Sequence, residues 1–322
     1  MNNKLLEIRN LSVEYYRAQK VIPAVSRVSL ELGEGEILGV VGESGCGKTT
    51  LGLALLRLIP KNEGKIIEGE VLLEGADICR MSEGDIRTLR GRKISMIFQD
   101  PFTSFNPVLT IGNQIAETIY QHDDAKQLTA DSVKKKISAV LEEVQIPQPG
   151  RVADSYPHQL SGGMLQRAML AMAVAASPQI LIADEPTTAL DVTIQKEILE
   201  LLLRLQKSLK LSIILITHNL GVIRKIANRV CIMYAGKIVE EAQTEELFHN
   251  PLHPYTRALL NSTPSLEKKT NRLPTIAGEV PQPGADECEF WPRCSAKTEF
   301  CSQQEPPWRK VGDSHKVRCE KS

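Results

Sequence analysis

The 322-residue sequence has no long apolar run, no excess of either charge and, before residue 288, no cluster of cysteines. The longest apolar run, from Ala168 to Ala176, holds nine residues, about half of the roughly 20 that a membrane-spanning helix needs. The first residues, Met-Asn-Asn-Lys-Leu-Leu-Glu-Ile, have no apolar core like that of a signal peptide. We therefore expect the chain to stay in the cytoplasm, where it can still dock on a membrane partner.

The charges of the chain balance, because Lys plus Arg and Asp plus Glu both number 39. The overall charge therefore does not indicate a nucleic-acid partner. Hydrophobic residues make up 42% and charged residues 24% of the chain, which is ordinary for a globular protein with a buried core. A chain of this length predicts about two domains.

A glycine-rich stretch fits the pattern G-x-x-x-x-G-K-[ST]: Gly42-Glu43-Ser44-Gly45-Cys46-Gly47-Lys48-Thr49. It follows a short apolar run at 37–41, typical of a buried strand, and precedes a helix-forming segment at 50–58. Glycines let several backbone N–H groups converge on phosphate oxygens, and the helix N-terminus adds partial positive charge. Lys48 would reach the β- and γ-phosphates, and the Thr49 hydroxyl would bind Mg²⁺. The stretch is therefore predicted to bind a nucleoside triphosphate.

Strand patterns and helix patterns alternate along the chain, which predicts an α/β fold with a largely parallel sheet. Strands are expected at 5–17, 25–32, 37–41, 66–75, 94–98, 179–184, 213–217, 229–234 and 237–240. The pattern is helical from 111 to about 176, with apolar residues on one face of 132–144, which predicts a helical subdomain. After about residue 250 the chain turns rich in Pro, polar residues and Cys without a sustained period. That tail is expected to be a separate, loop-rich appendage.

Further residues with chemical potential stand at element ends. Asp184 ends an apolar strand and could hold the Mg²⁺ shell, and Glu185 could polarise an attacking water. Ser161 suits an N-cap, and the two glycines after it expose backbone N–H groups at the start of a helix, which makes a second anion site. Tyr15, or Tyr16 in its place, could stack on a nucleotide base, although an ordinary edge aromatic is as consistent with the pattern.

In this order, and from about residue 5 to 262, the motifs resemble those of the ATP-binding cassette (ABC) family. The resemblance implies a P-loop NTPase cassette with a mostly parallel core sheet, an antiparallel β subdomain, a helical subdomain at about 100–176 and a C-terminal Cys-rich extension. It divides the chain into a nucleotide-binding domain at 1–250 and the extension at 251–322. The resemblance makes 42–49 the Walker A loop, 180–184 the Walker B strand and 160–166 the signature. The implied ATP-binding residues are Tyr15, Gly42, Glu43, Ser44, Gly45, Cys46, Gly47, Lys48, Thr49, Thr50, Gln99, Asp184 and His218.

The family resemblance also implies roles in catalysis and in pairing. Glu185, His218 and Gln99 would act in ATP hydrolysis, and Thr49, Gln99 and Asp184 would hold Mg²⁺. Two cassettes would pair head to tail, so that each ATP also meets residues of the other subunit; these are Ser161, Gly162, Gly163, Gln166 and Asp191. The chain departs from the family pattern at Leu165, where a polar or basic residue is more common, and at Asn219, where aspartate is common.

The last 70 or so residues resemble the C-terminal extension of oligopeptide and dipeptide permease ATPases, which nickel importers of the same subfamily share. The resemblance rests on residues 250–256, 278–281, 290–295 and 312–319. Four cysteines lie in this region: Cys288, Cys294, Cys301 and Cys319. Four thiolates can hold Zn²⁺ or a [4Fe–4S] cluster, and the absence of C-x2–4-C pairs favours the bulkier iron–sulfur cluster over zinc.

The resemblance implies that the chain hydrolyses ATP to energise an importer of di- or oligopeptides at the cytoplasmic face of the cell (inner) membrane. Its implied partners are a second cassette subunit, expected to be a paralogue, two transmembrane permease subunits and an extracytoplasmic solute-binding protein. Import of nickel or another small solute is the alternative within the subfamily. A soluble ABC ATPase acting on nucleic acid is a distant alternative, because the chain has one cassette, neutral charge and no long insert.

Overall fold

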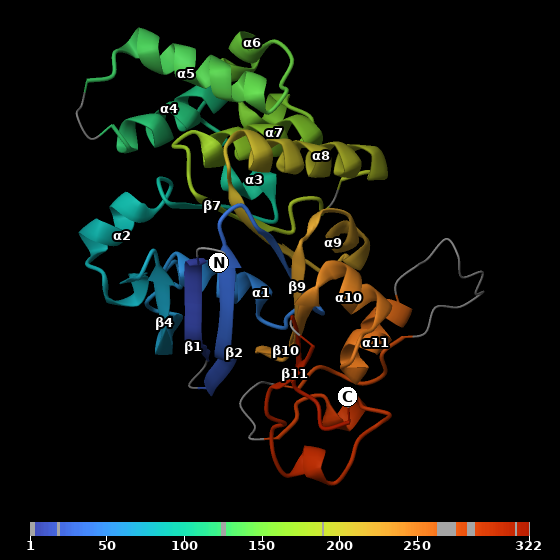
Figure 1. The fold of residues 1–322 in the computed structure, drawn as a ribbon. Coiled ribbons are helices and arrows are strands. Elements are labelled where there is room, and N and C mark those ends of the chain that lie inside the picture. The colour runs from blue at the N-terminus through green and yellow to red at the C-terminus, as the bar shows by residue number, and fades with distance from the viewer. Residues whose placement is uncertain are drawn as a thin grey trace. The chain divides into compact units, whose positions relative to one another are not determined.

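The computed structural model describes residues 4–17, 20–123, 127–188, 190–262, 275–281, 287–312 and 314–321 (Figure 1). The chain divides into two compact units. Unit 1 comprises residues 1–33, 37–80 and 215–322, and unit 2 comprises residues 34–36 and 81–214. The division falls within strand β8 (Ser212–Thr217).

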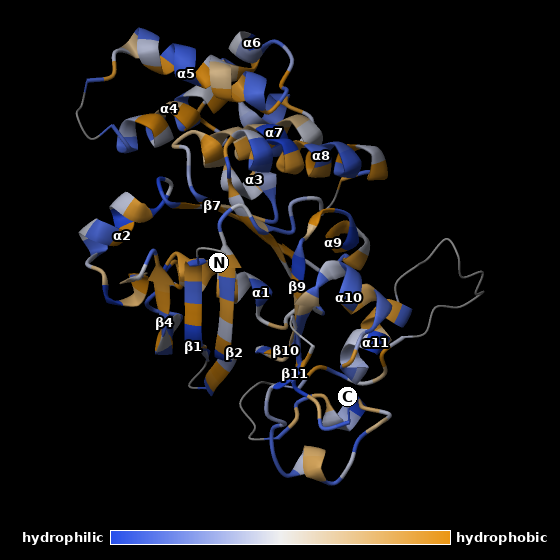
Figure 2. Ribbon diagram, in the orientation of Figure 1, coloured by the Kyte–Doolittle hydropathy of each residue, from blue (hydrophilic) through white to orange (hydrophobic). Residues whose placement is uncertain are grey.

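Unit 1 contains an antiparallel sheet with the strand order β2-β1-β4-β5. Its strands are β1 (Lys4–Arg17), β2 (Lys20–Gly33), β4 (Gly64–Leu73) and β5 (Ala76–Asp77). Leu11 and Val13 are buried and Tyr15 is half-buried on one face of β1, and the alternation of polar and apolar residues is visible along β1 and β2 in Figure 2. This period of two is what one buried sheet face requires, and the predicted antiparallel subdomain is confirmed.

A second set of strands in unit 1 lies in the order β11-β12-β10-β9-β3. These strands are β3 (Ile37–Val41), β9 (Arg229–Tyr234), β10 (Lys237–Gln243), β11 (Arg309–Val311) and β12 (His315–Val317). Strands β3 and β9 are parallel. The pairs β9 with β10, β10 with β12, and β12 with β11 are antiparallel. The predicted hairpin turns at Ala235 and Gly236, which both have positive φ as a tight hairpin turn requires.

The helices of unit 1 follow or flank these strands. They are α1 (Lys48–Leu55), η1 (Ile78–Arg80), α9 (Leu220–Ile226), α10 (Thr244–His249), α11 (Pro254–Asn261), η3 (Trp291–Arg293) and η4 (Phe300–Ser302).

Unit 2 is mainly helical and contains the parallel pair β6 (Ile94–Ile97) and β7 (Ile180–Asp184). Its helices are α2 (Glu83–Leu89), α3 (Pro101–Ser104), α4 (Ile111–Gln121), α5 (Ala130–Glu143), α6 (Pro149–Ala153), η2 (Pro157–Gln159), α7 (Gly162–Val174) and α8 (Val192–Ser208). The amphipathic helix expected at 132–144 is α5, which buries Val133, Ile137 and Leu141. Helices α3 to α7 fill the segment where a helical subdomain is predicted, and the two faces of α5 and α8 differ in hydropathy in Figure 2.

One expectation about the sheet is refined, and one about the tail is wrong. The core pairs β3 with β9 and β6 with β7 are parallel, whereas the 229–243 hairpin and the tail add antiparallel strands, so the strands pair in both directions. The tail is not a separate appendage, because β12 pairs with β10 at Glu240 and Glu241. Strands of three residues are too short to show a period in the sequence, so β11 and β12 could not be predicted from it.

No helix in the described parts of the chain has both the length and the apolar character needed to cross a bilayer. The division of the chain at about residue 250 stays a prediction.

Candidate functional site

The predicted phosphate loop connects the fully buried strand β3 to helix α1, as the sequence indicates. A Cβ at Gly42 would lie 2.1 Å from the Met233 carbonyl oxygen, and a Cβ at Gly47, where φ is +102°, would lie 2.2 Å from the Ala24 carbonyl oxygen. Only glycine fits at these two positions, because the loop backbone packs directly on the backbones of β2 and β9. The loop also accepts a hydrogen bond from Gly236 N–H at the Cys46 carbonyl, at 2.9 Å. The cradle that phosphate oxygens need is therefore built into unit 1.

Lys48 is buried, with 6% of its surface exposed. Its Nζ donates to the carbonyl oxygens of Gly42 at 2.8 Å and Glu43 at 2.9 Å, so the ammonium group lies inside the curve of the loop. Thr49 is exposed on the first turn of α1 and Thr50 is half-exposed, while Ser44 and Gly45 are exposed at the loop's outer edge. A phosphate group can therefore reach the loop's outer edge and the start of α1, where N–H groups are unpaired within the helix.

Tyr15 lies on β1 opposite Ile22 of β2 and Gly64 of β4. It is half-buried, and Ala24, two residues beyond its partner Ile22, contacts the phosphate loop at Gly47. Tyr16 is 39% exposed, and the Lys65 ammonium lies 5.8 Å from its ring centre. The register thus brings the end of β1 near the loop, and the choice of Tyr15 as the base-stacking residue stays a prediction.

The C-terminal part of unit 1 touches the phosphate loop at Glu43. Arg293 donates to both carboxylate oxygens of Glu43, at 2.7 and 3.1 Å. The Glu43 N–H donates to the Tyr255 hydroxyl at 2.9 Å. Neither Arg293 nor Tyr255 is among the predicted site residues, and no local sequence pattern indicates them, since they stand more than 200 residues from Glu43.

The two acidic residues predicted to act on ATP, Asp184 and Glu185, lie at the end of β7 in unit 2. Asp184 is 2% exposed and Glu185 is 9% exposed. Glu185 has a φ of +48°, an uncommon conformation for a residue other than glycine, and its Oε2 accepts a 3.0 Å hydrogen bond from the Thr188 hydroxyl. Backbone strain held at a buried carboxylate is typical of a functional position.

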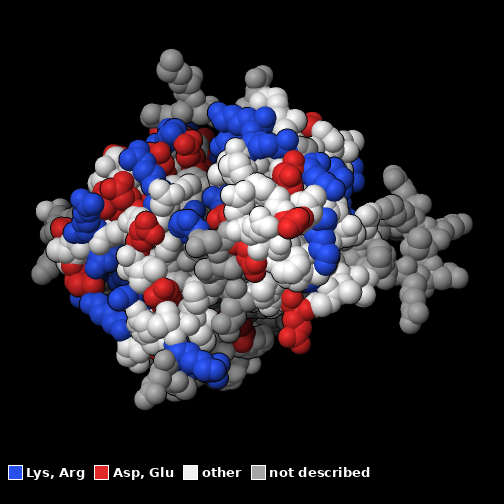
Figure 3. Space-filling model, turned by 90° about the horizontal axis from the view of Figure 1, so that it is seen from below, with Lys and Arg blue, Asp and Glu red and all other residues white. Residues whose placement is uncertain are grey.

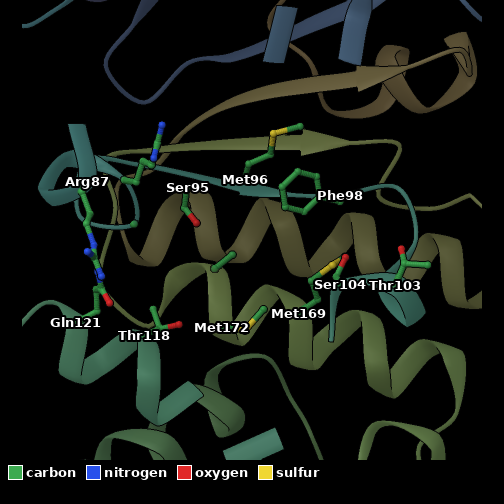
Figure 4. Close-up of a pocket in the computed structure, with 13 residues that line it drawn as sticks. Arg87, Ser95, Met96, Phe98, Thr103, Ser104, Thr118, Gln121, Met169 and Met172 are labelled. Atoms are coloured by element: carbon green, nitrogen blue, oxygen red, sulfur yellow. The ribbon is translucent and has the colours of Figure 1, made fainter. Parts of the chain in front are cut away.

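Gln99 is exposed and follows β6, and Asp100 after it caps α3 by accepting from the Phe102 N–H at 2.9 Å. A pocket of about 710 Å³ lies within unit 2 beside this segment. Figure 4 shows Met96 and Phe98 on its strand side, Met169 and Met172 of α7 opposite, and Arg87 reaching Gln121 at one end. The pocket has an apolar floor with polar ends.

The predicted second anion site is the N-terminus of α7. Ser161 is the N-cap, and its hydroxyl accepts from the Met164 N–H at 3.4 Å. A Cβ at Gly162 would lie 3.7 Å from Leu190, and one at Gly163 would lie 3.0 Å from Ile194, so this helix tip packs beside the start of α8. Asp191 caps α8 by accepting from two N–H groups at 3.0 Å.

The signature residues of α7 are therefore adjacent to Asp191 within unit 2. Ser161 is exposed, whereas Gln166 is 2% exposed and faces the unit's interior. Leu165 is fully buried, which explains why an apolar residue is accommodated there. The trans roles of these residues stay predictions.

His218 is exposed directly after β8, in unit 1. Asn219 beside it is the N-cap of α9 and accepts from the N–H groups of Gly221 at 2.9 Å and Val222 at 3.3 Å. Asparagine caps a helix about as well as aspartate, so this departure from the family pattern keeps the structural role of the position.

The predicted iron–sulfur ligands do not form a metal site in this structure. In the ranges that the structure describes, which include all four cysteines of the tail, no group of three or more His, Cys, Asp or Glu residues could hold a metal ion. The thiols do lie near one another: burial raises the pKa of Cys288 to about 12, and the nearby Cys301 and Cys294 add to the shift. Burial likewise raises the pKa of Cys294, with Cys319 and Cys301 as further causes. A metal at these four cysteines therefore stays a prediction.

Comparisons with known proteins agree with this geometry. The ABC transporter family matches residues 25–188, and the family described as oligopeptide/dipeptide transporter, C-terminal region, matches residues 239–301. The chain is 44% identical to the probable peptide ABC transporter ATP-binding protein y4tR of Sinorhizobium fredii, over 99% of this chain and 95% of that protein. It is 43% identical to the dipeptide transport ATP-binding protein DppD of Bacillus subtilis, over 98% of this chain and 94% of that protein.

Among solved structures, the chain resembles the dimeric ATP-binding cassette MJ0796 in a post-hydrolysis state bound to ADP and Pi. The TM-score is 0.67 and the identity 27%, over 74% of this chain and 98% of that one. The sequence motifs, the loop geometry and the near full-length relatives agree. The chain belongs to the ABC transporter family, as an ATP-binding subunit of the group that carries the oligopeptide/dipeptide transporter C-terminal region.

Proposed function

We propose that this protein is the ATP-hydrolysing subunit of an importer of di- or oligopeptides. The observation that carries the proposal is full-length similarity, at 43–44% identity, to ATP-binding proteins named for peptide, dipeptide and oligopeptide transport. This similarity covers the C-terminal region as well as the cassette. A soluble ATPase acting on nucleic acid would have no need of that region, and on the face seen in Figure 3 positive and negative side chains are interspersed.

In the proposed reaction, the phosphate loop and Lys48 bind the β- and γ-phosphates of ATP. Glycine is needed at positions 42 and 47 because any side chain there would collide with the backbone of Met233 or Ala24, and the loop shape that results presents N–H groups to the phosphate oxygens. Thr49, Gln99 and Asp184 offer the oxygen ligands that Mg²⁺ prefers, and the ion would neutralise charge on the phosphates. Glu185 orients and polarises the attacking water, and its hydrogen bond from Thr188 fixes the carboxylate. His218 contacts the γ-phosphate.

Two cassettes are proposed to pair head to tail around ATP. The exposed Ser161 tip of α7 carries unpaired backbone N–H groups and a positive partial charge, so it suits the γ-phosphate of a nucleotide held by a second subunit. The phosphate charge then holds the two subunits together, and its loss on hydrolysis releases them. The dimeric ATP-binding cassette similar to this chain supports the pairing.

The pocket of unit 2 is proposed to hold a short helix of a transmembrane permease subunit. Its apolar floor of Met96, Phe98, Met169 and Met172 suits the apolar face of a helix, and methionines adapt to irregular surfaces. Phe102, at 60% exposure, extends the apolar surface beside Gln99. Motion at Gln99 would thereby couple the nucleotide to the membrane subunits. The subunit would lie peripherally on the cytoplasmic face of the cell membrane, and an extracytoplasmic binding protein would deliver the solute.

A metal at the four tail cysteines also stays a proposal. It is supported by the spacing of the cysteines and by the mutual influence of their thiols, and opposed by the lack of a ready ligand group within the ranges that the structure describes. Iron, acid-labile sulfide and zinc analysis of protein purified without oxygen decides it. One cluster per chain would support iron–sulfur binding, and a metal-free chain with full ATPase activity would exclude it.

Uptake by cells tests the proposed function directly. The chain is expressed with the permease and cassette genes next to its own, in cells that lack peptide importers, and uptake of a labelled dipeptide, a labelled tetrapeptide and ⁶³Ni²⁺ is measured. Peptide uptake that requires the intact chain and stops with Glu185→Gln supports the proposal. Uptake of nickel alone would assign the alternative substrate, and uptake of none of the three would refute the proposal.

A further inference from the structure

Arg293, in the C-terminal region, uses every N–H of its guanidinium group around the phosphate loop. Two N–H groups bind the Glu43 carboxylate, at 2.7 and 3.1 Å. A third binds the Tyr234 hydroxyl at 3.2 Å, and the other two bind the carbonyl oxygens of Ala277 at 2.9 Å and Ile276 at 3.0 Å. A guanidinium group has five N–H donors, so this one is fully satisfied and fixed in orientation.

The pair is shielded from water. The Arg293 side chain is 5% exposed and that of Glu43 is 24% exposed. Two parallel hydrogen bonds between guanidinium and carboxylate are the strongest form of such a pair, and partial burial protects them from screening by salt. The hydrogen bond to Glu43 is the main reason why the pKa of Arg293 is raised, against the opposing effect of burial.

An aromatic cluster holds Arg293 and the loop together. Phe290, three residues before Arg293, packs edge-on to Tyr234 at 5.2 Å and against Tyr255 at 5.4 Å between ring centres. The rings of Tyr234 and Tyr255 lie 4.6 Å apart. The Tyr255 hydroxyl accepts a 2.9 Å hydrogen bond from the Glu43 N–H. The second residue of the phosphate loop is thus held by its side chain and by its backbone, from two parts of the C-terminal region.

The pair also has an electrostatic consequence. Glu43 stands inside the phosphate-binding motif, and its carbonyl oxygen accepts from the Lys48 ammonium at 2.9 Å. A bare carboxylate at this position would repel the triphosphate, because like charges a few ångströms apart interact strongly in a partly buried site. Arg293 neutralises that carboxylate from the side of the C-terminal region.

We propose that Arg293 is a positioning residue for ATP binding, which holds the phosphate loop in its binding shape and cancels the charge of Glu43. The inference rests on the proposed function, in that the loop binds ATP. Binding to a loop that is already held costs less conformational entropy. The C-terminal region therefore contributes to nucleotide affinity in addition to any role in the importer.

Titration calorimetry of the full-length chain with MgATP tests this inference. Arg293→Ala is expected to raise Kd about tenfold, the effect of losing one strong charge-assisted contact. Arg293→Lys keeps the positive charge but not the two parallel hydrogen bonds to Glu43, so its Kd should lie between those of wild type and Arg293→Ala. Adding Glu43→Gln to Arg293→Ala removes the uncompensated carboxylate and is expected to bring Kd back to within about threefold of wild type. Lys310→Ala, at an exposed position of the same region, is the control and leaves Kd unchanged.

The outcomes separate the inference from the proposed function. If the wild-type chain does not bind MgATP, the proposed function fails whatever Arg293 does. If wild type binds and Arg293→Ala binds equally well, the positioning role is wrong. If Arg293→Ala weakens binding but Glu43→Gln does not restore it, and the melting temperature falls in both, Arg293 is only structural. In the assembled ATPase, the inference also requires a raised KM for ATP with kcat changed less than about twofold.

Discussion

The phosphate loop of unit 1 and the Ser161 tip of unit 2 both begin a helix and both offer N–H groups to anions, yet they are held differently. The loop is enclosed by its own chain: Lys48 is buried inside it, and Arg293 and Tyr255 hold Glu43 from the C-terminal region. The tip is open, with an exposed Ser161 that makes one long cap hydrogen bond of 3.4 Å.

This difference indicates that the loop and the tip contribute to nucleotide binding in different ways. A loop preformed by its own chain can bind a nucleotide in an isolated subunit. A tip with exposed N–H groups and little support needs a ligand brought from elsewhere, which a second subunit supplies in the proposed dimer. Changes near the loop should therefore alter nucleotide affinity in the single chain, and changes at the tip should alter only the assembled pair.

The largest effect is expected from Glu185→Gln, which removes the base and leaves both anion-binding elements in place. ATP hydrolysis by the assembled importer should fall by about 100-fold or more, since general base catalysis contributes that much. Binding of MgATP should persist, and the dimer with ATP should accumulate in size-exclusion chromatography. Glu200→Gln, at an exposed glutamate of α8, is the control. Hydrolysis at the wild-type rate would remove Glu185 from the catalytic role.

Ser161→Ala should have the next largest effect and should act only between subunits. Loss of a hydrogen bond to a charged phosphate predicts a decrease of about 10- to 100-fold in ATPase activity of the assembled pair. MgATP binding to the isolated chain should stay within twofold of wild type. Thr129→Ala removes the matched N-cap of α5, with its 3.3 Å hydrogen bond from Ser132, at a similar cost of about 1 kcal/mol in helix stability. Equal losses of activity in both variants would mean that Ser161 is only a cap.

Tyr255→Phe tests the enclosed loop with a smaller change. The pKa of Tyr255 is raised well above its ordinary value by burial, so its hydroxyl stays neutral and accepts from the Glu43 N–H. Removing the hydroxyl leaves that N–H unsatisfied and should weaken MgATP binding by about 3- to 10-fold in the single chain. Tyr120→Phe, at a tyrosine 48% exposed on α4, is the control. Unchanged affinity would show that the backbone hydrogen bond does not shape the loop.

Much of this site could be predicted from the sequence, because each motif depends on neighbouring residues. The strand 37–41 with its glycine loop and helix, the acidic end of β7 and the cap at Ser161 all appear in the structure as predicted. These features follow from spacing, propensity and capping, which are local.

The contacts that hold the loop could not be predicted, because they are long-range. Arg293 reads as one basic residue in an irregular tail, and its partner Glu43 lies 250 residues away. The strand β12 is three residues long and gains its order from pairing with β10. Such contacts depend on side chains meeting in the folded chain, and no period in the sequence records them.

The last prediction concerns stability and not nucleotide binding: it tests the pairing of β12 with β10, which lies in unit 1 with the phosphate loop and not with the Ser161 tip. His315 Nε2 lies 2.7 Å from the buried Glu240 carboxylate, and Glu246 lies 3.6 Å from its Nδ1. Burial opposes the charged form of His315, but hydrogen bonds and charge from Glu240 and then Glu246 outweigh it and raise its pKa. Burial likewise opposes the charge of Glu240, but hydrogen bonds from His315 and from the N–H groups of Leu252 and His253 lower its pKa.

The sign of the pH effect follows from these two shifts. The contribution of His315 to the free energy of unfolding is complete below its ordinary pKa of 6.5, and it is lost as the pH rises through the raised pKa. The contribution of Glu240 is complete above its ordinary pKa of 4.5, and it is lost as the pH falls through the lowered pKa. His315→Gln should therefore destabilise the chain by about 1.5–3 kcal/mol between those two pH values and by less in alkaline solution. Thermal unfolding at several pH values measures this, with the exposed His249→Gln as the control. A loss of stability that does not change with pH would mean that the pair acts through packing and not through charge. In the assembled pair, Ser161→Ala should lower ATPase activity by the same factor with and without His315→Gln. A smaller factor in the His315→Gln chain would contradict the separation of loop and tip.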